Sequence, residues 1–249
     1  MTLVETSDYD GGVRVLRLND PDRRNAMGLA LGAQLRDAVA RCRADGVRVV
    51  VLTGAGSAFC AGADLPELFG YPDRTPDETT AVLRDYYRAF LDVYELPQPT
   101  IAAVNGPAVG AGLNLALACD LRVAGIDATF GATFAHIGLH PGGGSTWFLV
   151  RELGYAKAVE ILLRGRTLDA AEAVGSGLAT GPSDDPVADA VELARSIAET
   201  EPPLAVQIKR TAQLAAGGAT FEAVLEAETV AQAASAGSQR LQEWVARFR

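Results

Sequence analysis

The chain has 249 residues, of which 49% are hydrophobic and 21% are charged, a composition typical of a globular protein with a sizeable core. Its formal net charge is −9, which argues against nonspecific nucleic-acid binding, because such binding depends on neutralising phosphates. No apolar run reaches the roughly 20 residues of a membrane-spanning helix, and the start MTLVETSDYD lacks the pattern of a secretory signal. We therefore expect a cytoplasmic protein without a membrane partner.

The cysteines do not indicate a metal site or a disulfide framework. Cys42, Cys60 and Cys119 are widely spaced and match no zinc pattern. We expect reduced thiols and no bound metal.

The first half of the chain alternates between strand and helix patterns. Residues 13–18 alternate as a half-buried strand does, and residues 47–53 are almost continuously β-branched, which is typical of a strand covered on both faces. Further predicted elements are helices at 29–43, 77–94 and 110–119 and strands at 100–104 and 121–124. This alternation predicts an α/β core with mostly parallel crossovers.

After about residue 142 the sequence becomes rich in helix-forming residues. Helices are predicted at 145–152, 154–164, 168–176, 187–200, 202–216, 219–234 and 238–248. We divide the chain into an α/β core at 1–195 and a helical region at 196–249, and we interpret the excess of apolar helix faces as oligomer contacts.

Two turns rich in glycine and alanine follow predicted strands. The first is GAGSAFCAGADL at 54–65, and the second is NGPAVGAGLN at 105–114. Small residues let a ligand approach the main chain, and free N–H groups at a helix N-terminus favour negative charge. Neither turn fits a nucleotide-phosphate loop, so together they indicate a different anion-stabilising site.

The order of motifs resembles the crotonase superfamily, also called the enoyl-CoA hydratase/isomerase family. The resemblance runs over most of the chain in these stretches: NDPDRRNA (19–26), VVVLTGAGSAFCAGADL (49–65), IAAVNGPAVGAGLNLALACDLRVA (101–124), FGATFAHIGLHPGGGSTWFLVRELG (130–154) and LLRGRTLDAAEAVGSGLA (162–179). It implies a repeated β-β-α spiral core with C-terminal helices, assembled as a homotrimer or a dimer of trimers. It also implies an acyl-CoA thioester as substrate, with coenzyme A as part of that substrate and no separate cofactor.

The resemblance assigns roles to specific positions. The backbone N–H groups of Ala63 and Ala111 would hold the thioester oxygen and stabilise an enolate. Substrate-binding positions carried over in the same way are Arg24, Ala26, Ala61, Gly62, Ala63, Asp64, Leu65 and Ala111. Arg24 would contact a phosphate of coenzyme A.

The chain departs from the family where the acids should lie. The two glutamates of the hydratases fall here at Asn114 and Phe134, and the aspartate of an isomerase branch falls at Gly142. Neither asparagine nor phenylalanine exchanges a proton near neutral pH, so hydration by paired carboxylates is not expected. Isomerase-like or other enolate chemistry stays open, as do a catalytically silent acyl-CoA-binding protein and a purely structural oligomer.

The side chains left for proton transfer are few. His140 is the main candidate, because histidine transfers protons near neutral pH, and His136 is the other histidine. Asp64 reads as a turn or helix-cap residue. The helically spaced aromatic residues Tyr86, Tyr87 and Phe90 read as core or pocket wall.

Overall fold

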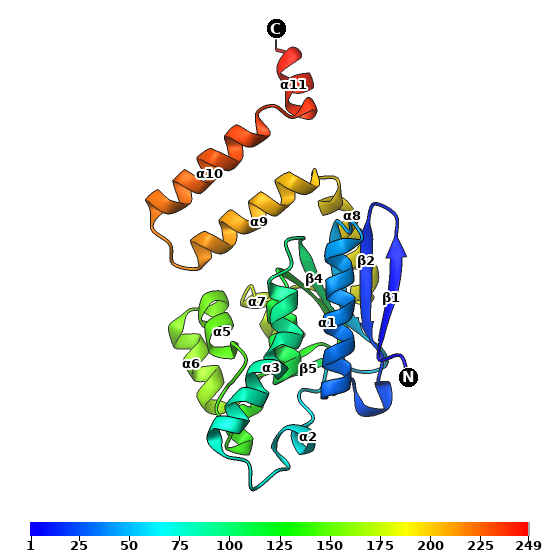
Figure 1. Ribbon diagram of the computed structural model, residues 1–249, viewed down its shortest axis with the longest axis vertical. Helices are drawn as coiled ribbons and strands as arrows, with labels where there is room; N and C mark the ends of the chain where they lie inside the picture. The colour runs from blue at the N-terminus through cyan, green and yellow to red at the C-terminus, as the bar shows by residue number, and fades with distance from the viewer. Residues whose placement is uncertain (249) are drawn as a thin grey trace. The chain divides into compact units, whose positions relative to one another are not determined.

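The computed structural model describes residues 1–248 and separates the chain into two compact units. The first unit is Met1–Ala198, and the second begins at Glu199. Figure 1 traces the chain through both, and each unit is described by itself.

The first unit contains two sheets. The larger has the strand order β1-β2-β3-β4-β6-β9, and the smaller has the order β5-β7-β8. Its strands are β1 (Val4–Tyr9), β2 (Val13–Leu18), β3 (Val49–Gly54), β4 (Thr100–Val104), β5 (Pro107–Val109), β6 (Leu121–Gly125), β7 (Thr129–Gly131), β8 (Thr167–Asp169) and β9 (Thr180–Ser183). From β2 to β9 each neighbouring pair of the larger sheet is parallel, while β1 joins β2 as an antiparallel hairpin. The predicted α/β fold with parallel crossovers is confirmed.

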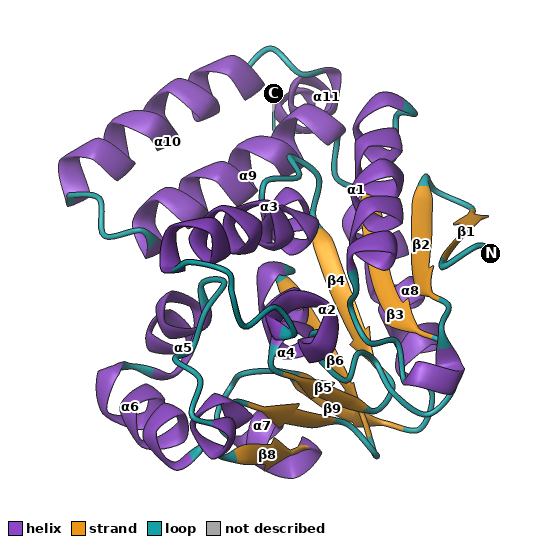
Figure 2. Ribbon diagram, turned by 60° about the horizontal axis from the view of Figure 1, so that its bottom comes forward, coloured by secondary structure: helices purple, strands orange, loops and turns teal. Residues whose placement is uncertain are grey.

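The helices of the first unit lie between and after these strands along the chain. They are α1 (Leu29–Ala44), α2 (Leu65–Phe69), α3 (Pro76–Tyr94), α4 (Ala111–Ala118), α5 (Ser145–Leu153), α6 (Tyr155–Arg164), α7 (Ala170–Gly175) and α8 (Pro186–Ala198), with short 3-10 turns η1 (Pro21–Arg23) and η2 (Thr133–Ile137). Figure 2 shows the strands with α1 and α8 packed against them.

The larger sheet is covered on both faces, which explains the continuous hydrophobic run of β3. Val49 and Val51 belong to a cluster with α8, whereas Val50 and Leu52 belong to the main core with α1, α3 and α4. All six residues of β3 are buried. Alternate side chains of one strand thus pack in two different cores.

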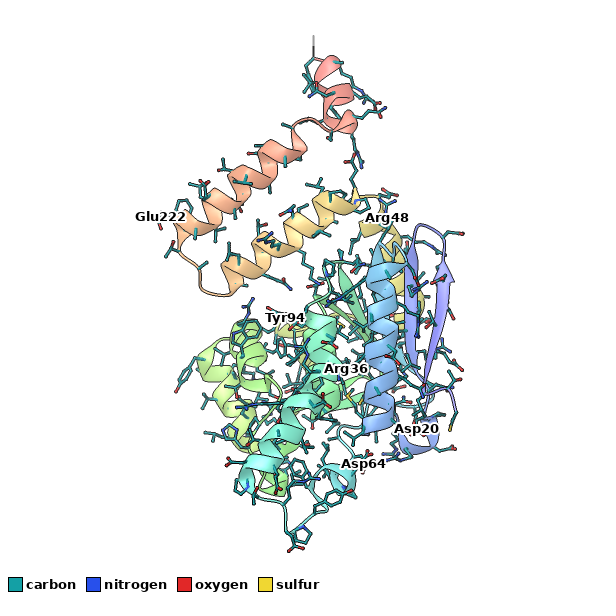
Figure 3. All side chains as sticks on the ribbon, in the orientation of Figure 1. Asp20, Arg36, Arg48, Asp64, Tyr94 and Glu222 are labelled. Atoms are coloured by element: carbon teal, nitrogen blue, oxygen red, sulfur yellow. The ribbon has the colours of Figure 1, made fainter. Side chains whose placement is uncertain are left out.

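Helices α1 and α3 lie side by side (Figure 1). Arg36 of α1 pairs with Asp85 and Asp92 of α3, at 3.2 and 3.1 Å, and Figure 3 labels Arg36 there. The start of α3 is capped by Thr75, whose hydroxyl accepts the Glu78 amide while the Glu78 carboxylate accepts the Thr75 amide.

One predicted helix is shorter than expected. The pattern at 168–176 predicts a single helix, but Asp169 caps α7 through the Glu172 amide at 2.8 Å. As the cap, Asp169 itself has an extended backbone, and residues 167–169 form β8, which pairs with β7.

The second unit is helical. It contains α9 (Pro202–Ala216), α10 (Phe221–Ser235) and α11 (Gln239–Ala246). No residue of these three helices, all within residues 1–248, is buried in the single chain.

Candidate active site

The two glycine-rich turns lie side by side at the carboxyl ends of β3 and β4. The Cys60 amide donates to the Pro107 carbonyl at 3.1 Å, and the Val109 amide donates to the Cys60 carbonyl at 3.0 Å. Gly62 has φ of +110°, and a Cβ there would lie 2.8 Å from the Val109 oxygen and 3.9 Å from the Ala111 nitrogen. Glycine is therefore required at 62, because any side chain would collide with the second turn.

The amides of Ala63 and Ala111 have no acceptor among residues 1–248. Ala111 is the first residue of α4, where an N–H group has no intrahelical partner. Ala63 follows Gly62 in the turn that touches Ala111. Two N–H groups without an acceptor thus lie in neighbouring turns, and the positive end of the α4 dipole lies at Ala111.

A loop from the N-terminal part holds the first turn in place. The Ala61 amide donates to the Arg24 carbonyl at 2.9 Å, and the Met27 amide donates to the Gly62 carbonyl at 2.7 Å. Arg24 and Asn25 both have positive φ. The buried Asn25 side chain offsets that strain by accepting from the Asp20 amide and donating to the Ala58 carbonyl.

The two donors open onto an apolar cavity of about 320 Å³. Its wall includes the side of α3 that carries Leu83, Tyr86, Tyr87 and Phe90. The other lining residues are Ala61, Gly62, Ala63, Leu65, Leu68, Phe69, Val109, Gly110, Ala111, Asn114, Thr133, Phe134, Ile137, Leu139, His140, Pro141 and Gly142. Within this lining there is no aspartate or glutamate.

The three positions of the expected acids all border this cavity. Asn114 is 2% exposed; its Nδ2 donates to the Gly142 carbonyl at 2.8 Å, and its Oδ1 accepts from the Ser145 hydroxyl. Asn114 therefore fastens α4 to the glycine loop at 142–144. Phe134 packs toward Gly110 and adds hydrocarbon where an acid would offer a proton.

His140 is the cavity's imidazole. Its Nδ1 lies 2.8 Å from the Pro141 carbonyl oxygen; because a carbonyl only accepts, this contact favours the neutral tautomer in which Nδ1 carries the proton and Nε2 has the lone pair. His136 is not part of the lining; its Nε2 bonds the Arg164 carbonyl at 3.0 Å.

Three predicted binding positions lie outside the cavity lining: Arg24, Ala26 and Asp64. Arg24 is exposed and Ala26 is half-buried. The Asp64 carboxylate accepts the Glu67 amide as the cap of α2 and pairs with Arg23, which also approaches Asp20. Figure 3 labels Asp20 and Asp64, the two carboxylates that this arginine joins.

Some wall residues were not singled out from the sequence. Leu83 completes an i, i+3, i+4, i+7 row with Tyr86, Tyr87 and Phe90 on α3, a spacing that was available in the sequence. Leu68 and Thr133 come from short elements without a periodic signal.

Residues 1–248 contain no group of three or more His, Cys, Asp or Glu side chains placed to hold a metal ion, and none of their helices is both long and apolar enough to cross a membrane.

Comparison with known proteins identifies the family. Residues 8–249 match the family described as enoyl-CoA hydratase/isomerase. The chain is 46% identical to a probable enoyl-CoA hydratase of Mycobacterium tuberculosis, covering 92% of this chain and 88% of that protein. It is 37% identical to the 1,2-epoxyphenylacetyl-CoA isomerase of Escherichia coli, with 97% and 94% covered. A crystal structure of an enoyl-CoA hydratase subunit from Geobacillus kaustophilus superimposes with a TM-score of 0.90 at 31% identity, covering 99% of this chain and 94% of that one. The chain therefore belongs to the enoyl-CoA hydratase/isomerase family and has its crotonase fold.

Proposed function

We propose that this acyl-CoA enzyme binds its thioester oxygen between the amides of Ala63 and Ala111 and stabilises an enolate there. The observation that supports this most directly is the pair of acceptor-free donors beside an apolar cavity. Charge that develops on the oxygen would meet donors already in place, and such a donor typically contributes about 3–4 kcal/mol to the transition state.

The reaction that suits this site is a proton-transfer isomerisation rather than hydration. Hydration by the paired route needs two carboxylates on one water, and the lining has none. A double-bond shift needs one group that takes a proton from C2 and returns it to C4, while the electron pair rests on the thioester oxygen. We assign this proton to Nε2 of His140, the free nitrogen of the only imidazole in the lining.

The alternative is a protein that binds acyl-CoA without turning it over. The carboxylate-free lining, with Phe134 and the hydrogen-bonded Asn114 in the acid positions, is the observation that favours it. Turnover of any thioester from a panel of enoyl- and acyl-CoAs would exclude this alternative.

The decisive experiment removes one N–H donor without changing a side chain. Replacing Ala63 or Ala111 by lactic acid converts the amide to an ester, and we expect kcat to fall about 10²- to 10³-fold. The control is the same replacement at Ala30, in the exposed first turn of α1, which should leave kcat within about twofold, since such an exposed group lies outside the special positions that carry large mutational effects. Unchanged turnover in both the Ala63 and Ala111 esters would contradict the proposal.

A further inference from the structure

The direction of the Ala63 N–H group is fixed from the side of the turn that faces away from the cavity. The Gly62 carbonyl and the Ala63 N–H belong to one trans peptide unit, in which the two groups point in opposite directions. The Met27 amide donates to that carbonyl at 2.7 Å, and the Asp64 amide donates to the Met27 carbonyl at 3.2 Å. Because the Gly62 carbonyl is held toward Met27, the Ala63 N–H points away from Met27.

The bond from Met27 also strengthens the donor that it orients. When the carbonyl of a peptide accepts a hydrogen bond, the N–H of the same peptide becomes more polarised and donates better. Met27 is 0% exposed and does not line the cavity. It therefore acts on Ala63 through the peptide plane and not through the substrate.

The place of Met27 depends in turn on the buried side chain of Asn25. Asn25 is 0% exposed and has φ of +56°, a conformation that few residues other than glycine, asparagine and aspartate adopt. Its Nδ2 donates to the carbonyl oxygens of Ala55 and Ala58 at 2.9 and 2.8 Å. One side chain thus ties the segment 24–27 to the first turn.

Without this side chain the segment would lose its attachment to the turn. The carbonyl oxygens of Ala55 and Ala58 would lose the donor that Asn25 supplies, and a buried acceptor without a partner is costly, so the loop would rearrange to find one. A shift of about 1 Å in a group that positions the reacting atoms can lower the rate about 10²-fold.

The geometry points to Asn25 as a positioning residue for the oxyanion-binding amide of Ala63. It holds the Met27 amide against the Gly62 carbonyl and thereby aims the Ala63 N–H, although Asn25 itself does not line the cavity. The inference rests on the proposed function, because it needs Ala63 to hold the thioester oxygen. Ala111 is independent of this attachment, since no hydrogen bond among residues 1–248 joins it to the segment 24–27.

A double-substitution cycle on the full-length protein tests this role, with turnover measured on the thioester that the unaltered protein converts fastest. Asn25→Gly removes the side-chain amide and tolerates the positive φ. It should lower kcat about 10- to 100-fold and change KM less than about threefold, because only the aim of a transition-state donor is lost.

The two esters described above serve as backgrounds for the same substitution. In the Ala63 ester no N–H is left to aim, so Asn25→Gly should lower kcat by less than about threefold. In the Ala111 ester the Ala63 amide is intact, and the full 10- to 100-fold loss (about the range for a displaced group) should remain.

Asn19→Gly is the matched control. The Asn19 Nδ2 donates to the Glu5 carboxylate at 2.9 Å, and none of its hydrogen bonds within residues 1–248 reaches the first turn. It should change kcat less than about twofold. If Asn25→Gly folds poorly, replacing Met27 by its α-hydroxy acid removes only the N–H that the Gly62 carbonyl accepts, and it should show the same dependence on the background.

The outcomes separate the inference from the proposed function. An equal loss of kcat in the Ala63 and Ala111 esters, or no loss in the otherwise unaltered chain, overturns the inference alone, because a purely structural role of Asn25 would weaken both donors alike. A protein that converts no thioester, or an Ala63 ester as active as the unaltered chain, contradicts the proposed function and the inference with it.

Discussion

At the scale of single residues, the donors assigned to the substrate belong to the main chain. A backbone N–H donates whatever its side chain, so Ala63 and Ala111 are recognisable from the sequence only because their neighbours are small. A Cβ added at Gly62 would lie 2.8 Å from the Val109 oxygen, and this close approach of the two turns is the physical reason why position 62 needs glycine.

His140 gives a first prediction at this scale. His140→Gln keeps a polar side chain but cannot carry a proton, so kcat should fall at least about 10²-fold while acyl-CoA affinity changes little. Turnover is measured on the thioester that the unaltered protein converts fastest. His136→Gln, outside the lining, is the matched control; a similar loss in both variants would point to folding rather than proton transfer.

Cys60, within the first turn, gives a pH-dependent prediction. Complete burial raises the pKa of its thiol to about 11, whereas the thiol of the unfolded chain ionises near its ordinary value of 9.0. Above pH 9 the unfolded state loses its proton and the native state does not, so this group costs stability as pH rises from 9 toward 11.

Urea unfolding at pH 8 and pH 10.5, at one protein concentration, measures this effect. The free energy of unfolding should fall by about 2 kcal/mol more in the unaltered protein than in Cys60→Ala, from 1.36 kcal/mol for each pKa unit. An equal fall in the free energy of unfolding in both proteins would contradict the prediction, because it would show that the Cys60 thiol ionises in the native state as readily as in the unfolded chain.

At the scale of elements, the sequence predicts what its periodicity encodes. The long helices and the buried strand β3 are visible because their apolar residues recur at regular spacing or without interruption. Strands β1, β5, β7, β8 and β9 were not predicted. The three-residue segments β5, β7 and β8 have no period, and they form only because each pairs with a segment distant in the chain.

The sequence likewise predicts only part of the candidate site. Its two turns and the positions Asn114, Phe134 and Gly142 follow from motif order. The hydrogen bond from Asn114 to the Gly142 carbonyl and the approach of Tyr87 to the same loop could not be predicted, because they depend on how α3, α4 and the loop pack together. Asn114 therefore has a structural role at this position, because its side chain ties α4 to the loop.

At the scale of the whole molecule, the second unit lacks a core of its own. Its helices expose Ile208 at 57%, Phe221 at 74% and Val230 at 61%. Apolar surface of this kind on a soluble protein is typical of an interface. We expect these helices to contact other copies of the chain, as in the homotrimer or dimer of trimers implied by the resemblance.

Light scattering coupled to size-exclusion chromatography tests this expectation at micromolar concentration. The mass should be three or six times the 26.0 kDa of one chain, and Val230→Asp should lower it, because a charge cannot be buried there without a large cost. Gln232→Asp adds the same charge at an exposed polar position of α10 and should not. A monomer in the unaltered protein would contradict the assignment.

The carboxylate-free lining has a consequence for how the site responds to its surroundings. Main-chain dipoles do not titrate, so the field that Ala63, Ala111 and the start of α4 impose on an oxyanion is the same in acid and in base as long as the fold persists. In a His140→Gln variant, which removes the imidazole from the lining, the affinity for a neutral carbonyl mimic should then be the same at every pH, and a bell-shaped or stepwise pH dependence of the rate in the unaltered protein would report the proton carrier.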